Sequence, residues 1–154
     1  MQYICLPFTD LSTSQLYEIL RLRSEVFVVE QNCVYQDLDC KDTQIGVQHL
    51  MMLDNEQLLG YARLLPPRIS YDTPSIGRII ISSTARDKGL GRMLIQEAME
   101  RTFTLWPKLE ITIGAQSHLS IMYQSLGFKE MSEHYLEDGI MHVDMNTNAH
   151  MNED

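Results

Sequence analysis

A glycine-rich turn carries the clearest chemical signal in the sequence. It reads Arg86-Asp87-Lys88-Gly89-Leu90-Gly91-Arg92 and follows the β-branched run Ile79-Ile80-Ile81. A helix that begins at such a turn offers unpaired N–H groups and the positive end of its dipole to an anion. The two glycines let the backbone come close to a ligand, and the basic side chains add positive charge. The turn therefore predicts an anion site suited to a pyrophosphate group. Its spacing differs from that of the Walker loop and of the dinucleotide-binding GxGxxG turn.

Strands and helices alternate around this turn. Apolar or alternating patterns predict strands at 1–6, 47–53, 58–65, 75–81, 109–114, 128–131 and 140–145. Helical spacing predicts helices at 13–28, 90–103 and 119–126. Ser12 and Gln15 form a plausible capping box for the first helix, and Gly127 is expected to end the last one in a left-handed conformation. The order predicts a single α/β domain over 1–145, with a mixed central sheet flanked by helices, and a polar, disordered tail at 146–154.

The charge of the chain is uneven. Its 154 residues suit one globular domain, and 21 acids against 12 bases give a net charge of −9. This balance argues against a nucleic-acid partner and against docking on an anionic membrane, because both need an extended basic surface. Residues 78–108 nevertheless hold six bases and three acids. One short basic segment, which contains the glycine-rich turn, therefore lies within an acidic chain.

Other functional classes lack their signals in this sequence. No apolar run approaches the roughly 20 residues of a membrane span, and the first residues lack the basic region of a signal peptide. Three cysteines without paired spacing make a disulfide framework or a zinc site unexpected. The polar loop predicted at 32–43 is rich in aspartate but lacks the glycine and the closing glutamate of a calcium loop. We therefore expect a cytoplasmic protein with no metal site.

The glycine-rich turn resembles the acetyl-CoA signature of the GNAT N-acetyltransferases. Arg86, Gly89 and Gly91 match its RxxGxG pattern after a β-branched strand. The second signature of that family is a tyrosine on a short helix followed by Leu-Gly-Phe, which Tyr123 and residues 126–128 match. Both motifs occur in the family's order, with one helix and one strand between them. The order of elements also agrees, so the resemblance covers nearly the whole chain and implies the GNAT fold.

Three further stretches are similar to the ElaA-like branch of this family. They are Arg23-x-x-Val26-Phe27-Val28-Val29-Glu30-Gln31, then Tyr35-x-Asp37-Leu38-Asp39 followed by His49-Leu50, and Tyr135-Leu136-Glu137-Asp138-Gly139-Ile140-x-His142-Val143. The resemblance implies an enzyme that transfers the acetyl group of acetyl-CoA to a primary amine, by direct attack of the amine on the thioester.

The resemblance also implies where acetyl-CoA binds. The turn from Arg86 to Arg92 would hold the pyrophosphate. The exposed edge of the strand at Ile79, Ile80 and Ile81 would pair with the amides of the pantetheine arm as an added strand. One backbone N–H there would donate to the thioester oxygen as negative charge develops on it. Gln116, in the loop expected after the fifth strand, would contact the same arm.

Such a transfer needs an acid and a base. Tyr123 is expected to protonate the CoA thiolate, because the ordinary pKa of a phenol, about 10, is close to that of an alkyl thiol. The base is less clear, since the strand at 75–81 lacks the glutamate found there in many family members. Glu30 at the end of the first predicted helix is the first candidate, and His142 in the closing strand is the second. The alternatives are a solvated helix end and a hydrogen-bonded structural histidine.

The acceptor and the partners are left open by the sequence. The acidic loop at 37–42 would favour a cationic amine if it lined the cleft, and a polyamine-like amine, an amino sugar or a peptide amine are the candidates. Arg78, within an apolar strand, could pair with an acid near the acceptor or extend to the sheet edge. The alternative to catalysis is an acyl-CoA-binding sensor or scaffold. The sequence does not decide whether the chain forms a homodimer.

Overall fold

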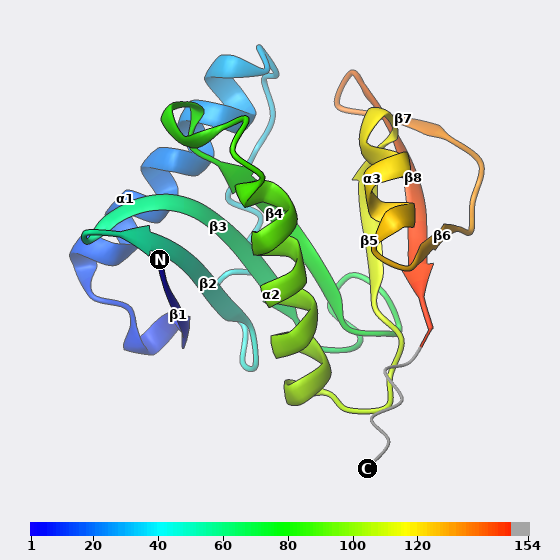
Figure 1. Ribbon diagram of the computed structural model, residues 1–154, viewed down its shortest axis with the longest axis horizontal. Coiled ribbons are helices and arrows are strands. Elements are labelled where there is room, and N and C mark those ends of the chain that lie inside the picture. The colour runs from blue at the N-terminus through cyan, green and yellow to red at the C-terminus, as the bar shows by residue number, and fades with distance from the viewer. Residues whose placement is uncertain (149–154) are drawn as a thin grey trace.

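Eight strands form one mixed sheet in the computed structural model, which describes residues 1–148 (Figure 1). The strands are β1 (Gln2–Pro7), β2 (Gln48–Asp54), β3 (Gln57–Leu65), β4 (Ser75–Ile81), β5 (Thr112–Gln116), β6 (Phe128–Glu130), β7 (Tyr135–Glu137) and β8 (Ile140–Thr147). The α-helices are α1 (Thr13–Arg23), α2 (Leu90–Leu105) and α3 (Ser120–Ser125). Short 3₁₀ helices lie at Phe8–Asp10 (η1), Ser83–Ala85 (η3) and Ser117–Leu119 (η4), and the π-helix η2 (Ser24–Glu30) continues α1.

The sheet is divided in its middle. Its strand order is β1-β2-β3-β4-β5-β8-β6, and β7 pairs with β8. The neighbours β4 and β5 run parallel and meet at one pair of residues, Ser75 and Thr112. Figure 1 shows the two strands diverging from that point. The edge of β4 that faces β5 is therefore unpaired over most of its length within the described chain.

Two apolar clusters hold the helices to opposite faces of the sheet. On one face, α2 and α3 pack over the inner side chains of β3, β5 and β8, where Leu94 of α2 joins Leu64 and Val143 of the sheet in one apolar cluster. On the other face, α1 and η2 pack through Ile19 and Val26 against β2, β3 and β4. Because the sheet lies between two helical layers, the predicted mixed α/β sheet flanked by helices is confirmed.

Local signals account for the ends of α1 and α3. Ser12 and Gln15 form the predicted capping box, in which each side chain accepts a hydrogen bond from the other residue's backbone N–H. The first helix was predicted to end at residue 28. The helical segment instead continues to Glu30, and its last part, η2, is a π-helix. Gly127 follows α3 with a φ of 103°, the left-handed conformation expected there.

Three details differ from the sequence prediction. The fifth strand runs over 112–116 rather than 109–114. The short strand β7 was not predicted, and three residues give too little pattern to indicate it. The last strand continues to Thr147, two residues beyond the strand end predicted at 145. Of the predicted tail at 146–154, residues 149–154 lie outside the described residues. Among the described helices, none has the length and apolar character of a membrane span.

Candidate active site

The divergence of β4 from β5 opens a cleft of about 850 Å³. Residues from both halves of the sheet line it, together with residues from η2 and α3. They include Ile79 and Ile81 of β4, Ala115 and Gln116 of β5, Tyr123 of α3 and Glu30 of η2. The cleft thus collects most of the residues that the sequence predicted to act together. Within residues 1–148, no group of His, Cys, Asp and Glu side chains is placed to hold a metal ion.

The glycine-rich turn leads into α2 at one end of the cleft. Gly89 is the N-cap, with a φ of 75°, and no side chain caps the helix. The first backbone bond of α2 runs from the N–H of Met93 to the carbonyl of Gly89, at 3.3 Å. The N–H groups of Leu90, Gly91 and Arg92 therefore have no partner within the helix. A Cβ atom at Gly89 would meet nothing within 4 Å, so open space lies beside these donors. This arrangement fits a pyrophosphate.

Arg86 and Glu30 form an ion pair across the mouth of the cleft. The guanidinium contacts both carboxylate oxygens, with 2.9 Å between Nη2 and Oε1, and its Nε donates to the carbonyl of Ile81 at 3.2 Å. The side chains are 36% and 40% exposed. The hydrogen bond from Arg86 lowers the pKa of Glu30 and raises that of Arg86. Glu30 thus holds the arginine of the cofactor turn, and its lowered pKa weakens it as a base.

The other turn residues are placed differently from one another. Arg92 turns toward α3, where its Nη1 donates to the Ser125 hydroxyl at 2.6 Å. Asp87, with a φ of 63°, and Lys88 form the turn before the N-cap Gly89. Of the basic side chains in this turn, Arg86 is the one that lines the cleft.

A β-bulge shapes β4 where it faces the cleft. Tyr61 pairs with Ile80 and Arg63 pairs with Gly77, so two residues of β4 lie opposite one residue of β3. Arg78, in the bulge, has a φ of 52°, which is uncommon for a residue with a Cβ. Bulges redirect side chains and interrupt pairing. Here the interruption lies beside the unpaired edge of β4, where an extended amide-bearing chain can add as a strand.

Tyr123 lies in the wall of the cleft between α3 and the sheet. Its side chain is buried, 5% exposed, and its ring packs edge-on against Phe128 with 5.8 Å between the ring centres. The hydroxyl makes no hydrogen bond to another described residue. Burial raises the pKa of Tyr123, so the phenol keeps its proton at neutral pH. A protonated hydroxyl with no internal partner can donate to a group bound in the cleft.

His142 lines the same cleft from β8 and is 13% exposed. Its Nδ1 lies 2.8 Å from the carbonyl oxygen of Ile140. Because a carbonyl only accepts, Nδ1 carries the proton and Nε2 presents its lone pair in the neutral ring. Nε2 is 4.0 Å from the Glu137 carboxylate, and the ring stacks on Tyr135. Gln116 pairs with His142 across β5 and β8, and both residues line the cleft.

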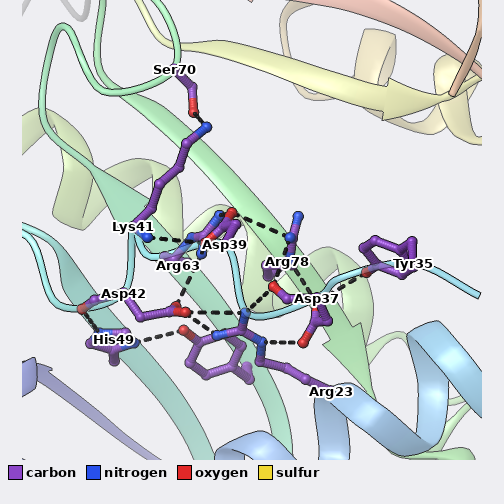
Figure 2. Close-up of polar contacts among 11 residues, drawn as sticks. Arg23, Tyr35, Asp37, Asp39, Lys41, Asp42, His49, Arg63, Ser70 and Arg78 are labelled. Carbon is purple, nitrogen blue, oxygen red and sulfur yellow. Dashed lines mark hydrogen bonds and ion pairs between the residues drawn. The ribbon is translucent and has the colours of Figure 1, made fainter. Parts of the chain in front are cut away.

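Three arginines and three aspartates form a buried network beside the cleft (Figure 2). Arg23, which is fully buried, binds Asp37 at 3.0 Å and Asp42 at 2.6 Å. The other two arginines complete the network, as Arg63 binds Asp39 and Asp42 while Arg78 binds Asp37 and Asp39. The three aspartates of the predicted acidic loop are therefore neutralised by three arginines. The loop by itself gives no reason to expect a cationic acceptor.

The network keeps Asp39 and Asp42 ionised. Burial opposes ionisation of Asp39, but the hydrogen bonds and charge of Arg63 outweigh burial and hold its pKa below the ordinary value. Arg23 has the same effect on the pKa of Asp42, again against the opposing effect of burial. Of the two readings of Arg78, pairing with an acid is the one that the structure shows. Arg23 occupies a core-facing helical position, and a charge at such a position is the sequence signal for a buried pair.

One contact at the cleft has no signal in the sequence. The Cys33 thiol donates to the carbonyl oxygen of Asp138, with 2.9 Å between sulfur and oxygen. This contact joins the loop after η2 to the turn between β7 and β8, and both residues line the cleft. No local pattern connects two positions so far apart in the chain.

Comparison with known proteins gives matches along almost the entire chain. A model of the acetyltransferase (GNAT) domain matches residues 11–149. Protein ElaA of Escherichia coli K12 is 42% identical over 140 residues, which are 91% of this chain and 92% of that protein. The crystal structure of Escherichia coli ElaA superposes with a TM-score of 0.90 over 96% of this chain and 99% of that chain.

Two further solved structures are similar. An acyl-CoA N-acyltransferase from Pseudomonas aeruginosa has a TM-score of 0.90 and 41% sequence identity, and the match covers 95% of this chain and 98% of that chain. An aminoglycoside 6′-N-acetyltransferase, solved with coenzyme A, shares the fold alone, with a TM-score of 0.71 and 13% identity over 98% of this chain and 99% of that chain.

Proposed function

Because the chain belongs to the GNAT acetyltransferase family, we propose that it transfers the acetyl group of acetyl-CoA to a primary amine. The observation that supports this most directly is the unpaired edge of β4 beside the uncapped start of α2. Extended amides and a pyrophosphate are the two groups that these features can bind, and coenzyme A carries both. Acetyl-CoA supplies the activated acetyl group.

The chain's own residues would bind this co-substrate with their backbone. The free N–H groups at the start of α2 hold the pyrophosphate, and the edge of Ile79, Ile80 and Ile81 aligns the pantetheine arm. A backbone N–H beside the bulge at Arg78 stabilises negative charge on the thioester oxygen, an effect worth about 3–4 kcal/mol per donor in comparable sites. Gln116, on the facing wall, contacts the same arm.

Tyr123 is the proposed general acid. Its hydroxyl is protonated because burial raises its pKa, and it makes no hydrogen bond to another described residue that would have to break before it donates. It therefore gives its proton to the sulfur of the leaving CoA, and no charged side chain is needed in this apolar wall.

His142 replaces Glu30 as the proposed base. Glu30 has a lowered pKa and already binds Arg86, whereas Nε2 of His142 presents a lone pair toward the cleft. His142 takes the proton from the acceptor ammonium, directly or through a water, and Glu137 stabilises the imidazolium that forms. Glu30 keeps a different role, which is to hold Arg86 for the cofactor.

Two measurements test the proposal. Calorimetry should show CoA binding, and a thiol reagent should show CoA release from acetyl-CoA when a panel of primary amines is added. Arg86→Gln should weaken CoA binding, whereas Arg21→Gln, an exposed arginine of α1 outside the cleft, should not. CoA binding with no thiol release from any amine would favour the non-catalytic sensor instead. A comparison of acetyl-CoA with propionyl-CoA tests the acyl group, and the cytoplasmic location stays a prediction.

A further inference from the structure

The buried network leaves two cationic side chains with free donors at the cleft. Its three arginines and three aspartates cancel in charge, so the acidic loop offers no net negative field. Arg78 belongs to this network and also lines the cleft, as does Lys41, which lies outside the arginine–aspartate pairs. The hydrogen-bond donors that Arg78 and Lys41 leave free decide which charge this part of the cleft can bind.

Arg78 is held on one side and open on the other. Its Nη2 donates to the carbonyl of Asp37 at 3.0 Å and to Oδ2 of Asp39 at 3.3 Å. Its Nε lies 2.8 Å from Oδ1 of Asp37, close enough for an ion pair although the N–H does not point at the oxygen. The guanidinium also lies over the ring of Tyr35, 5.7 Å from its centre. Nη1 donates to no other residue within 1–148, and the side chain is 22% exposed. Two N–H donors of a fixed guanidinium therefore remain available.

Lys41 adds a second free charge to the lining of the same cleft. Its Nζ donates to the Ser70 hydroxyl at 2.7 Å and pairs with no acid among the described residues. Figure 2 shows that the Lys41 side chain and the unbonded nitrogen of Arg78 extend to the same side of the network, away from Arg23. A guanidinium with two free donors, in a cleft that an ammonium group also lines, suits the binding of a carboxylate.

The opposite wall of the cleft has the opposite charge. Glu137 and Asp138, in the turn between β7 and β8, line the cleft beside His142. Glu137 is largely exposed, and the imidazole of His142 lies 4.0 Å from its carboxylate. One wall therefore suits an ammonium group, and the facing wall, at Arg78 and Lys41, suits an anion.

We propose that the acceptor is an amino acid-like molecule, which carries a carboxylate as well as the reacting amine. Arg78 and Lys41 bind the carboxylate, and the amine lies toward His142. This assignment rests on the proposed acetyl transfer and adds its substrate class. The left-handed residue at the bulge then has a purpose, because it directs a strand arginine to the acceptor while the strand edge stays free for the cofactor.

Matched acceptors test the assignment. Each amino acid is compared with its own carboxamide, which has the same shape and reacting amine but no negative charge. The wild-type protein should prefer the carboxylate by roughly 10-fold or more in kcat/KM, the usual effect of hydrogen bonds to a charged group. Equal use of both members of each pair, or a preference for the carboxamide or for a phosphate-bearing amine, would overturn the assignment.

Three variants locate the effect. Lys41→Met should remove most of the preference, mainly through a higher KM for the amino acid. Lys129→Met is the matched control, because Lys129 is an exposed lysine of β6 outside the cleft, and it should keep the full preference. Arg78→Lys keeps a charge but loses the guanidinium edge, so it should lower the preference too, provided that its thermal melt stays cooperative. A Lys41→Met protein with unchanged preference would count against this site.

A binding measurement separates this proposal from the proposed function. N-acetylated amino acids, which are the expected products, are titrated into the CoA-loaded protein by calorimetry. If no amine releases thiol but these carboxylates bind and Lys41→Met weakens them about 10-fold, the acetyl transfer fails and the carboxylate site stands. If amines are acetylated but these carboxylates bind no more tightly than their carboxamides, the carboxylate site fails and the transfer stands.

Discussion

Replacing Tyr123 by phenylalanine separates catalysis from folding in this protein. The change removes one oxygen atom and leaves the ring on Phe128 in its apolar wall. The hydroxyl has no hydrogen-bond partner among the described residues, so no buried group loses its partner. The free energy of unfolding should therefore change by less than about 1 kcal/mol. Loss of the general acid should lower kcat by roughly 10²- to 10⁴-fold, or about 3–5 kcal/mol of activation free energy.

The assay follows thiol release from acetyl-CoA with the best acceptor of an amine panel, over a range of pH. Because burial raises the pKa of Tyr123 above its ordinary value of about 10, the wild-type kcat should show no loss from ionisation of this phenol below about pH 10. Urea unfolding and calorimetry with CoA give the two controls. Both should match the wild type, because neither the fold nor the backbone that binds the cofactor depends on the hydroxyl.

Two results would refute this reasoning. Unchanged turnover in Tyr123→Phe would show that solvent or another group protonates the thiolate. A loss of stability above about 2 kcal/mol would show that the hydroxyl has a structural partner, and the fall in rate would then carry no information about proton transfer.

Four further predictions concern the charged residues. Glu30→Gln removes the partner that holds Arg86 in place and should weaken CoA binding by up to about 5-fold with kcat preserved, whereas a fall in kcat with unchanged binding would make Glu30 the base. His142→Gln should lower kcat/KM at neutral pH by about 100-fold and leave it rising with pH as the free amine forms; a profile like that of the wild type would remove His142 from the reaction. Arg23→Met should cost about 3–5 kcal/mol in urea unfolding, because two aspartates lose a buried partner, while the exposed Arg21→Met should cost less than about 0.5 kcal/mol. The lowered pKa of Asp39 contributes stability above its ordinary pKa of about 4 that is lost as the pH falls through the lowered value, so Asp39→Asn should flatten the acid-side loss of stability.

The sequence predicts the features that depend on neighbouring residues. The glycine turn, the capping box of α1 and the end of α3 are local, because each is set by hydrogen bonds or dihedral angles within a few positions. The apolar strands and helices follow from periodicity in the same way. Gly89 is the clearest case, since its φ of 75° is a conformation that glycine adopts at little cost, and the pattern around it indicated a helix start.

The sequence cannot predict which charges meet. Glu30 as a base was a reasonable hypothesis for an acid near a cofactor turn, but Arg86 lies 56 positions away and binds it in the fold. The net charge of the acidic loop likewise depends on arginines of α1, β3 and β4 that lie far from most of the loop in sequence and neutralise it in the fold. Pairing of this kind is set by strand register and helix packing, and no local pattern encodes either one.

The net charge of −9 and the charge of the cleft are therefore separate quantities. The three aspartates within residues 37–42 are neutralised by the arginines of the network. The donors that stay free on this side of the cleft belong to Arg78 and Lys41, and both side chains are cationic. In the proposed reaction, Arg78 connects the two substrates, because its backbone lies in the bulge beside the strand edge proposed for the cofactor and its side chain lines the cleft proposed for the acceptor. Arg78 would thus influence the binding of both substrates, because it shapes the edge of β4 and also supplies positive charge to the cleft. Acceptor choice in this protein should therefore follow the identity of residue 78 more closely than the charge of the loop beside it.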